Sequence, residues 1–416
     1  MRMINPAGEN IVVPREQSQA SSRAEDHLIG VINAGSSSLK FSVYEDERPI
    51  ISGQVGGIGS RLSVSTSQAD GQPLDPPDFG SRPPKTPSDV LPLLVPWVKK
   101  ILGGRLLSAL GHRVVHGGVR YSRPQRVTPE LLDELERLVP LAPLHEPHNL
   151  APIRTALALN PTLLQVACFD TAFHRTAPEV AQAFALPREL YEEGIRRYGF
   201  HGLSYEYLAS VLPERAPEIA NGRVILAHLG NGASLCAING CRSIASTMGF
   251  SVLDGLPMGT RCGQVDPGAL LYLIEHKKMS PEAISRLLYQ QSGMLGLSGV
   301  SSDFRDLLES RDPRADFAVE VFCYQTVRYI GSLAAALGGL DGIVFTGGVG
   351  ENAVEIRKIV CNGCHWLGLE LDEAANRRHG PLISKAGSRV AAYVMETDEN
   401  LVIARHTRNL LGRCKA

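Results

Sequence analysis

The 416-residue sequence has no excess of charge of either sign, since 42 Lys and Arg side chains stand against 43 Asp and Glu side chains. This balance excludes binding to nucleic acid or membrane through an overall field, so any anion site must be local. No apolar run approaches the roughly 18–20 residues that a membrane helix needs. An export signal is also missing, because residues 11–13 form the only apolar cluster before residue 28. We therefore expect a cytoplasmic protein in which residues 1–27 form a polar, disordered extension.

The eight cysteines are scattered, and without export they are expected to be thiols. Cys361-Asn-Gly-Cys364-His365 matches the C-x-x-C-H pattern of c-type haem attachment. However, this pattern lies within Val354 to Leu371, where apolar residues recur at roughly helical spacing. We favour a helix with packing cysteines over haem, and no second C-x-x-C completes a zinc site.

Neither a P-loop nor a Rossmann glycine fingerprint occurs in the sequence. Instead, a predicted buried strand from Leu28 to Ile32 ends in the small-residue turn Asn33-Ala-Gly-Ser-Ser-Ser38. A second strand, Leu39 to Tyr44, follows and carries Lys40. Such a turn can bring backbone N–H groups and hydroxyls close to an anion, and Lys40 adds a point charge suited to phosphate. Alone, it is equally consistent with an ordinary polar hairpin.

The same pattern recurs twice. A strand, the turn Gly230-Asn-Gly-Ala-Ser234 and a second strand occupy residues 223–238. The strand beginning at Gly342 leads into a third turn, Gly347-Gly-Val-Gly-Glu-Asn352. The first two copies indicate a duplicated domain, and three such turns after three strands are hard to explain by packing alone.

Charged residues stand at the ends of other predicted strands. Arg113 ends the strand Leu106 to Val115 and is followed by glycines, which suits a bidentate clamp on carboxylate or phosphate, the alternative being a surface arginine. Asp170 follows the strand Leu163 to Phe169, at the end where α/β folds bind ligands. The acidic turn at residues 396–400 suggests a Mg²⁺ site, or by itself a solvated loop.

Three motifs are specific enough to suggest a family: Asn33 to Lys40, Arg197-Tyr-Gly-Phe-His-Gly202 and Met258-Gly-Thr-Arg-Cys-Gly263. With them the chain resembles the acetokinase family of the sugar kinase/Hsp70/actin superfamily from about Leu28 to Leu411. The resemblance implies an α/β fold of two domains with a duplicated RNase-H-like, actin-like core, an interdomain cleft and a homodimer. The first domain would comprise residues 28–171 plus 401–416, and the nucleotide-binding domain residues 172–400.

The resemblance also implies a reaction, the reversible Mg²⁺-dependent transfer of a phosphoryl group from ATP to acetate, giving acetyl phosphate and ADP. A carboxylate acceptor with a pKa of about 4–5 is already ionised at pH 7, so it needs no general base. Arg113 and Arg261 would hold the carboxylate and the phosphoryl group in an in-line transition state. By the same resemblance, His201 would donate a hydrogen bond, Asp170 would be an orienting carboxylate, and His145 would lie near the cleft. Asn33 and Glu399 would be the ligands of Mg²⁺ (or Mn²⁺).

The remaining implied residues form two groups. The acyl pocket would consist of Arg113, Val115, Leu144, Phe200 and Val252. Phosphates and nucleoside would contact Ser36, Ser38, Lys40, His228, Leu229, Gly230, Asn231, Gly232, Asp303, Phe304, Arg305, Gly347, Gly348, Val349, Gly350, Glu351 and Asn352.

The sequence departs from the family pattern near the acyl pocket. Val252 occupies a position where the family usually has proline, while Asp254 and Asn400 each replace a more usual glutamate. We expect acetate to remain the preferred acid, with a propionate or butyrate kinase as the nearest alternative. A nucleotide-hydrolysing binding protein of the actin or Hsp70 type is a second alternative, which two arginines and a histidine in the cleft argue against.

Overall fold

The computed structural model of the chain describes residues 27–35, 37–80 and 83–415. The expected N-terminal extension, apart from its last residue, and Ser36 of the predicted phosphate turn lie outside these ranges. None of the helices described there is long and apolar enough to cross a membrane.

Two mixed β-sheets organise the described residues. The first has the order β4-β3-β2-β1-β5-β7-β6 and the second β10-β9-β8-β11-β12. The first sheet consists of β1 (Leu28–Ala34), β2 (Leu39–Glu45), β3 (Arg48–Gly56), β4 (Ser63–Gln68), β5 (Leu107–Val114), β6 (Gln125–Arg126) and β7 (Leu164–Phe169). The second consists of β8 (Arg223–His228), β9 (Ser234–Asn239), β10 (Arg242–Ser246), β11 (Gly342–Thr346) and β12 (Ala391–Val394).

The two sheets share one topology. In the first, β1, β2 and β3 pair antiparallel in sequence, and β5 and β7 then add in parallel on the other side of β1. In the second, β8, β9 and β10 form the antiparallel part, and β11 and β12 add in parallel beside β8. The structure therefore confirms the predicted duplication. We call the parts built on the two sheets the N-terminal unit and the C-terminal unit.

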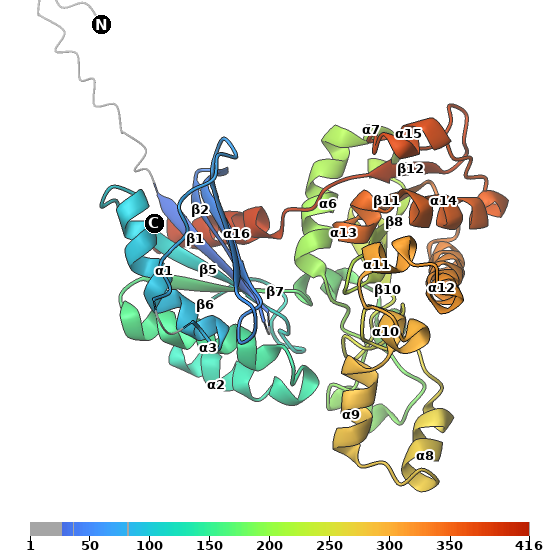
Figure 1. The fold of residues 1–416 in the computed structure, drawn as a ribbon, viewed down its shortest axis with the longest axis horizontal. Helices are drawn as coiled ribbons and strands as arrows, with labels where there is room; N and C mark the ends of the chain where they lie inside the picture. Colours follow the sequence, from blue (N-terminus) through green and yellow to red (C-terminus); the bar gives the residue numbers. More distant parts are fainter. Residues whose placement is uncertain (1–26, 36, 81–82, 416) are drawn as a thin grey trace, which may run out of the picture.

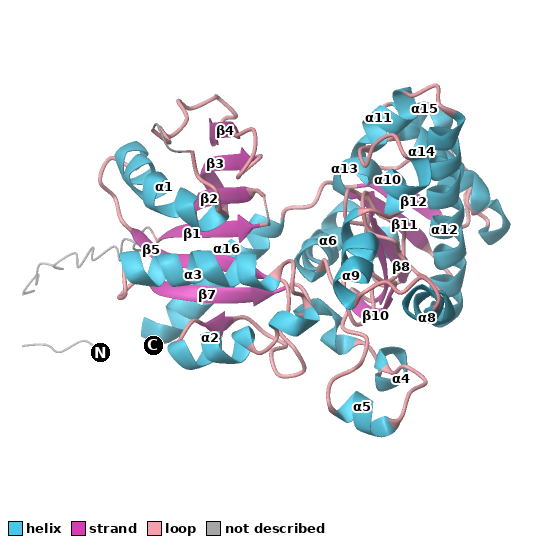
Figure 2. Ribbon diagram, turned by 60° about the horizontal axis from the view of Figure 1, so that its bottom comes forward, coloured by secondary structure: helices cyan, strands magenta, loops and turns pink. Residues whose placement is uncertain are grey.

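The helices form layers around the sheets (Figures 1 and 2). Those of the N-terminal unit and its connection to the next are α1 (Pro87–Ile101), α2 (Pro129–Glu136), α3 (Glu146–Leu159), α4 (Glu179–Gln182), α5 (Arg188–Glu192), α6 (Gly202–Arg215) and α7 (Pro217–Ala220). The remainder are α8 (Pro267–Glu275), α9 (Pro281–Gln290), α10 (Gly293–Ser298), α11 (Phe304–Glu309), α12 (Pro313–Leu337), α13 (Gly347–Asn352), α14 (Val354–Gly363), α15 (Glu373–Arg377) and α16 (Glu399–Lys415). Short 3-10 helices are η1 (Val139–Leu141), η2 (Ala172–Thr176) and η3 (His365–Leu367).

One hydrophobic core joins the two units. It contains side chains from β1, from α6 and α16, and from β8, including Val31, Leu208, Ile403 and Leu226. After β12 the chain crosses back, and α16 packs on β1, β5 and β7 (Figure 1). Helices α6 and α16 pack against each other at this junction, so the packing does not mark where one domain ends. The predicted domain boundaries near residues 171 and 400 therefore stay a prediction.

The predicted strands before the three turns are present, while several boundaries differ. The sequence alone predicts a short helix from Pro152 to Leu159, but helix α3 begins at Glu146, because a proline in the first turn is tolerated and packing accommodates the second one. The Pro, Ser, Asp and Gly content of residues 66–89 predicts a surface loop, but strand β4 lies partly within this stretch, and its pairing with β3 accounts for it. Cys361 lies on α14 and Cys364 caps it, and both are fully buried, as the packing interpretation predicted.

Candidate active site

Arg113 near the end of β5 is held by the carboxylate that follows the neighbouring strand β7. Its Nε and Nη2 atoms donate to Oδ2 of Asp170 at 2.9 and 2.5 Å. Asp170 is fully buried, and its Oδ1 atom has no partner among the residues that the structure describes. Burial raises the pKa of Asp170 to about 6, with Arg113 opposing the rise and Glu399 adding to it. The pair presents the free edge of Arg113 in a fixed orientation.

Asn33 links this pair to the start of α16. Its Oδ1 accepts from Nη1 of Arg113 at 3.4 Å, and its Nδ2 donates to Oε2 of Glu399 at 3.0 Å. Burial would raise the pKa of Glu399, but Arg113, His228, Lys40 and Asn33 together outweigh it and lower the pKa. Glu399 is therefore ionised at neutral pH, and it comes from a segment that follows the second sheet.

The oxygens of Asn33, Asp170 and Glu399 are candidate ligands for a cation. No group of three or more His, Cys, Asp or Glu side chains suited to a metal occurs in the described part of the chain. Mg²⁺ commonly takes one or two carboxylates and completes its shell with water and substrate phosphates. Glu399, the Asn33 amide and the unpartnered Oδ1 of Asp170 supply ligands of that kind. The donor set therefore fits Mg²⁺ bound together with a nucleotide.

Arg261 is a half-buried cation without a carboxylate partner among the described residues. Its Nη1 donates to the backbone carbonyl of Val252 at 2.8 Å, and no ion pair to it occurs among the described residues. Burial, with the nearby charge of Arg113, lowers the pKa of Arg261 to about 10. A Cβ atom at Gly232 would lie 2.6 Å from Nη2 of Arg261 and 3.2 Å from Nε2 of His201. The second glycine turn, Arg261 and His201 therefore meet at one point.

Three imidazoles surround the two arginines. His201 caps α6 in a left-handed conformation with φ of 58°, and its ring stacks on His228 with 4.3 Å between centroids. Burial holds the pKa of His201 well below its usual value, with contributions from His228, Arg261 and Arg113. Burial also lowers the pKa of His228, and together with Arg261 and Arg113 it lowers that of His145 to about 3. All three imidazoles are thus neutral at pH 7, which leaves the arginines as the cations of the site.

The second glycine turn packs against the third, which in the structure is the short helix α13. The amides of Val349 and Gly350 donate to the carbonyl of Leu229 at 2.8 and 3.1 Å. The Glu351 carboxylate accepts from the amide of Gly347 at 2.8 Å, so it braces its own turn. Gly347 has φ of 76°, a conformation that glycine adopts without strain.

Next to these turns lies a cavity of about 890 Å³. Eight of the residues predicted to bind nucleotide line it: Gly230, Asn231, Asp303, Phe304, Arg305, Gly348, Val349 and Asn352. Ser302, Leu308, Glu309 and Ala353, which were not predicted, complete the wall. Asp303 caps α11 and pairs with Arg305 at 2.6 Å, which fixes the rim of the cavity. This volume lies within the range of small-molecule and cofactor sites.

The predicted acyl-pocket residues fall into two groups. Val115, Phe200 and Val252 belong to one buried hydrophobic cluster with exposed fractions of 2, 1 and 5%. Leu144 is only half-buried and lines a separate open cavity opposite α9. The structure therefore gathers Val115, Phe200 and Val252 in one core, of which the Val252 carbonyl contacts Arg261, and it places Leu144 in a different cavity.

Comparisons with known proteins identify the family of this chain. The acetokinase family model matches residues 28–405. The chain is 53% identical to the acetate kinase of Nitrobacter hamburgensis, with 92% of this chain and 95% of the relative covered. The crystal structure of Porphyromonas gingivalis acetate kinase is similar with a TM-score of 0.81 at 35% identity, covering 92% of this chain and all of that one. The chain belongs to the acetokinase family.

A propionate kinase structure is also similar to this acetokinase chain. The protein from Francisella tularensis is 33% identical, with a TM-score of 0.85 over 92% of this chain and 99% of that one. These structural neighbours confirm the predicted mixed α/β, actin-like architecture. Since both kinds of enzyme share the fold, the identity of the acid depends on the pocket.

Several polar residues of the acetokinase site were not predicted. Ser234 lies 2.8 Å from Nδ1 of His201 and 2.5 Å from the Tyr205 hydroxyl, and Ser204 lies 2.9 Å from Nδ1 of His228. Asn149 donates to the carbonyl of Ala34 beneath the first turn at 2.7 Å. Ser234 ends a glycine turn that the sequence had already indicated. The others occupy helices, where nothing in their spacing distinguishes them from packing residues.

Proposed function

We propose that the protein is an acetate kinase that transfers the terminal phosphoryl group of ATP to the carboxylate of acetate. The observation that carries this proposal is Arg261, a half-buried guanidinium with no carboxylate partner among the described residues, in the electrostatic range of Arg113. Two cations facing one space suit two anions that must approach each other. Removing one oriented donor of this type typically costs about 10²–10³ in rate.

The proposed chemistry needs no base. The acetate carboxylate is ionised at pH 7, and one of its oxygens forms a bond to phosphorus while the bond from phosphorus to the ADP oxygen breaks. Arg113, held by Asp170, binds the acceptor side, and Arg261 neutralises charge on the transferred group. Their positions are supported by the Asp170 ion pair and by the Val252 carbonyl.

His201 acts in this proposal as a neutral donor. Burial raises the pKa of the Tyr205 hydroxyl, which therefore keeps its proton and can donate to Ser234. Ser234 then donates to Nδ1 of His201, which leaves the ring proton on Nε2. Nε2 faces the space that stays open because Gly232 has no side chain, and a phosphoryl oxygen would fit there.

Mg²⁺ would be held by Glu399 with support from Asn33 and the free oxygen of Asp170, and it would neutralise charge on the phosphates. The cavity of about 890 Å³ beside the second and third turns would take the nucleoside and the inner phosphates of ATP. Lys40 and Ser38, on the hairpin that begins the N-terminal unit, would contact the phosphates from the opposite side.

Acetate is the proposed acid because the walls of Val115, Phe200 and Val252 are fully packed. One methylene in an apolar pocket contributes about 1–3 kcal/mol to discrimination, so propionate would be a poorer but measurable substrate. A propionate kinase remains the second candidate, because a relative carrying that name shares 33% identity and the fold.

The deciding experiment is trapping of the acyl phosphate with hydroxylamine after incubation with ATP, Mg²⁺ and acetate, propionate or butyrate. We expect a hydroxamate with all three, most with acetate. ATP hydrolysis without hydroxamate would contradict the proposal and favour an actin-like or Hsp70-like protein. A larger kcat/KM for propionate would contradict the choice of acid alone.

We also propose a cytoplasmic homodimer. The seven cysteines whose side chains the structure describes are free thiols, which fits a reducing compartment. Helix α8 buries none of its residues, yet it exposes Leu271, Tyr272 and Ile274 by 55, 51 and 46%. Contact with a second copy would cover this apolar surface. Light scattering should give twice the chain mass, and Leu271→Glu should shift it toward the monomer.

A further inference from the structure

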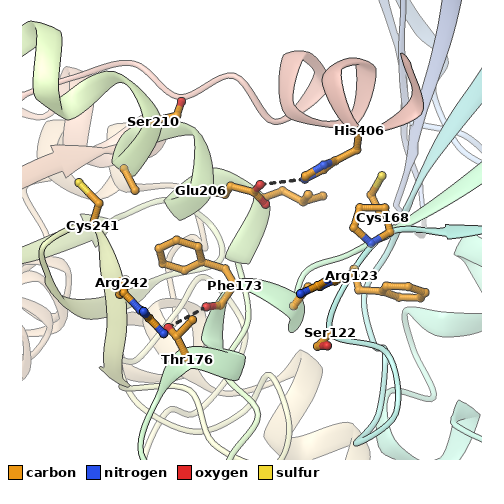
Figure 3. Close-up of a pocket in the computed structure, with 15 residues that line it drawn as sticks. Ser122, Arg123, Cys168, Phe173, Thr176, Glu206, Ser210, Cys241, Arg242 and His406 are labelled. Atoms are coloured by element: carbon orange, nitrogen blue, oxygen red, sulfur yellow. Dashed lines mark hydrogen bonds and ion pairs between the residues drawn. The ribbon is translucent and has the colours of Figure 1, made fainter. Parts of the chain in front are cut away.

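A third cavity lies at the junction of the two units (Figure 3). Its volume is about 440 Å³, and its walls come from β7, η2, α6, the start of β10 and α16. None of its lining residues belongs to the proposed catalytic, acyl or nucleotide sites. It is therefore separate from the site described above while touching both units.

Two arginines from different units enter this cavity. Arg123 lies between β5 and β6 in the N-terminal unit, and Arg242 begins β10 in the C-terminal unit. Figure 3 shows both side chains entering the cavity from opposite sides. Neither guanidinium has an ion-pair partner within residues 27–35, 37–80 and 83–415. The carboxylate of Glu206, which also lines the cavity, is instead engaged by His406 at 2.8 Å.

The wall between the arginines is apolar. Phe169, Phe173 and Leu203 supply it, so a ligand held by both cations would lay a carbon skeleton on these side chains. A cavity of this size is within the range of small-molecule sites. Two guanidinium groups that approach from opposite sides suit a ligand with an anionic group at each end.

Two residues of the same wall are close in sequence to proposed catalytic residues. Phe169 directly precedes Asp170, and Leu203 lies two residues after His201. The two segments are joined by the amide of Gly202, which donates to the Asp170 carbonyl at 2.9 Å. A Cβ atom at Gly202 would come within 2.0 Å of that carbonyl oxygen, so the junction has no spare space. A ligand on this wall thus contacts Phe169, which is next to the Asp170 that holds Arg113. It also contacts Leu203, which is close to the His201 that would donate to the phosphoryl group.

We propose that the cavity between Arg123 and Arg242 is a regulatory site for a small organic dianion, which bridges the two units and changes turnover by biasing their relative orientation. An effector acts in this way only if it binds one arrangement of the units more tightly than another. A ligand gripped by one arginine from each unit meets that condition, because its two contacts depend on the distance between the units.

Calorimetric titration tests the binding part. Succinate and glycerol 3-phosphate are the probes, and succinamate, with one charge, is the control ligand. ADP, Mg²⁺ and acetate are present to occupy the catalytic site. We expect a dianion to bind and succinamate to bind at least about tenfold more weakly, as for loss of a charge-assisted contact. Binding of succinate alone would identify a dicarboxylate, and of glycerol 3-phosphate alone a phosphorylated ligand.

The variants Arg123→Ala and Arg242→Ala should each lower the affinity for the dianion at least about tenfold. Arg126→Ala is the matched control, since Arg126 is an exposed arginine on β6 that does not line the cavity. Absence of binding by either dianion, or equal binding by all three variants, would overturn the site. The binding assay does not depend on which acid the enzyme phosphorylates.

Turnover tests the coupling. The dianion that binds should change kcat or the KM for ATP of the parent enzyme and of Arg126→Ala. Without ligand, Arg123→Ala and Arg242→Ala should turn over like the parent, and they should not respond to the dianion at concentrations that saturate the parent. A ligand that binds through both arginines but leaves kcat and both KM values unchanged would overturn the regulatory role.

Discussion

Replacing Arg261 by methionine should separate activity from stability. Methionine keeps much of the length of the side chain while removing its charge, so it avoids a large cavity. The activity should fall strongly, because the charge that faces the transferred phosphoryl group is lost. We expect kcat to drop by about 10²–10³, with a smaller effect on the KM for ATP.

The stability of the ligand-free protein should not fall in the same way. Burial next to Arg113 lowers the pKa of Arg261 to about 10, so the folded protein carries this charge at a cost. A tenfold change in a proton-binding constant corresponds to about 1.4 kcal/mol, which puts the cost at about 3 kcal/mol. Against this stands the lost hydrogen bond to the Val252 carbonyl, about 1–3 kcal/mol for a buried group left unpaired. The net change in the free energy of unfolding is then between zero and about 2 kcal/mol of stabilisation.

Arg113→Met provides the contrast. Its removal leaves Asp170 fully buried without its partner, and breaking a buried pair on one side costs about 3–5 kcal/mol. Urea unfolding of the ligand-free proteins measures both changes, and steady-state kinetics with acetate and ATP measures the activity. If Arg261→Met loses as much stability as Arg113→Met, or keeps kcat within threefold of the parent, Arg261 is not an unpaired charge held for an anion.

Three further predictions concern other parts of the site. Because the pKa of Asp170 is raised to about 6, its carboxylate is protonated below that pH, so kcat/KM should fall on the acid side of the pH profile. Asp170→Asn should be poorly active at every pH and should lack this acid-side fall, whereas an unchanged fall would assign the titration to another group. Val252→Ala should narrow the acetate-to-propionate ratio of kcat/KM while leaving the KM for ATP nearly constant, whereas an unchanged ratio would remove Val252 from the acyl pocket. The double variant Cys361→Ala, Cys364→Ala should keep its turnover and lose some thermal stability, because both thiols are buried in the core; loss of turnover in a folded variant would contradict a purely packing role.

The sequence predicted the elements whose pattern is local and strong. The sequence showed β1 with the turn after it, and the repeat of this pattern in the C-terminal unit. Both copies combine an apolar strand with a turn of small residues. Strands β3 and β4 were missed, since their polar and glycine-containing sequences are held by pairing with neighbours rather than by their own pattern. The start of α3 was also wrong, because packing accommodates Pro152 inside the helix.

The candidate site divides in the same way. Arg113 and Asp170 could be placed at strand ends from the sequence, but their direct contact depends on β5 and β7 lying next to each other, which no local pattern states. The hydrogen bonds from Ser234 and Ser204 to the two imidazoles depend on how α6 packs on the second sheet. Such contacts between distant segments require the tertiary structure.

The duplicated topology explains why carboxylates from both ends of the chain meet. In each unit the outer parallel strand, β7 or β12, is followed by an acidic residue, Asp170 in the first and Glu399 in the second. Because α16 crosses back to the first sheet, Glu399 reaches Asn33 and lies in the field of Arg113, whose partner is Asp170. The charge of Glu399 adds to the cost of ionising Asp170, whose pKa stays raised although Arg113 opposes the rise. A cation bound with ATP would offset the remainder, so the protein should bind Mg²⁺ weakly alone and more tightly with nucleotide. Glu399→Gln should reduce this coupling, measured as the ratio of Mg²⁺ affinities with and without ADP, while an unchanged ratio would place the metal elsewhere.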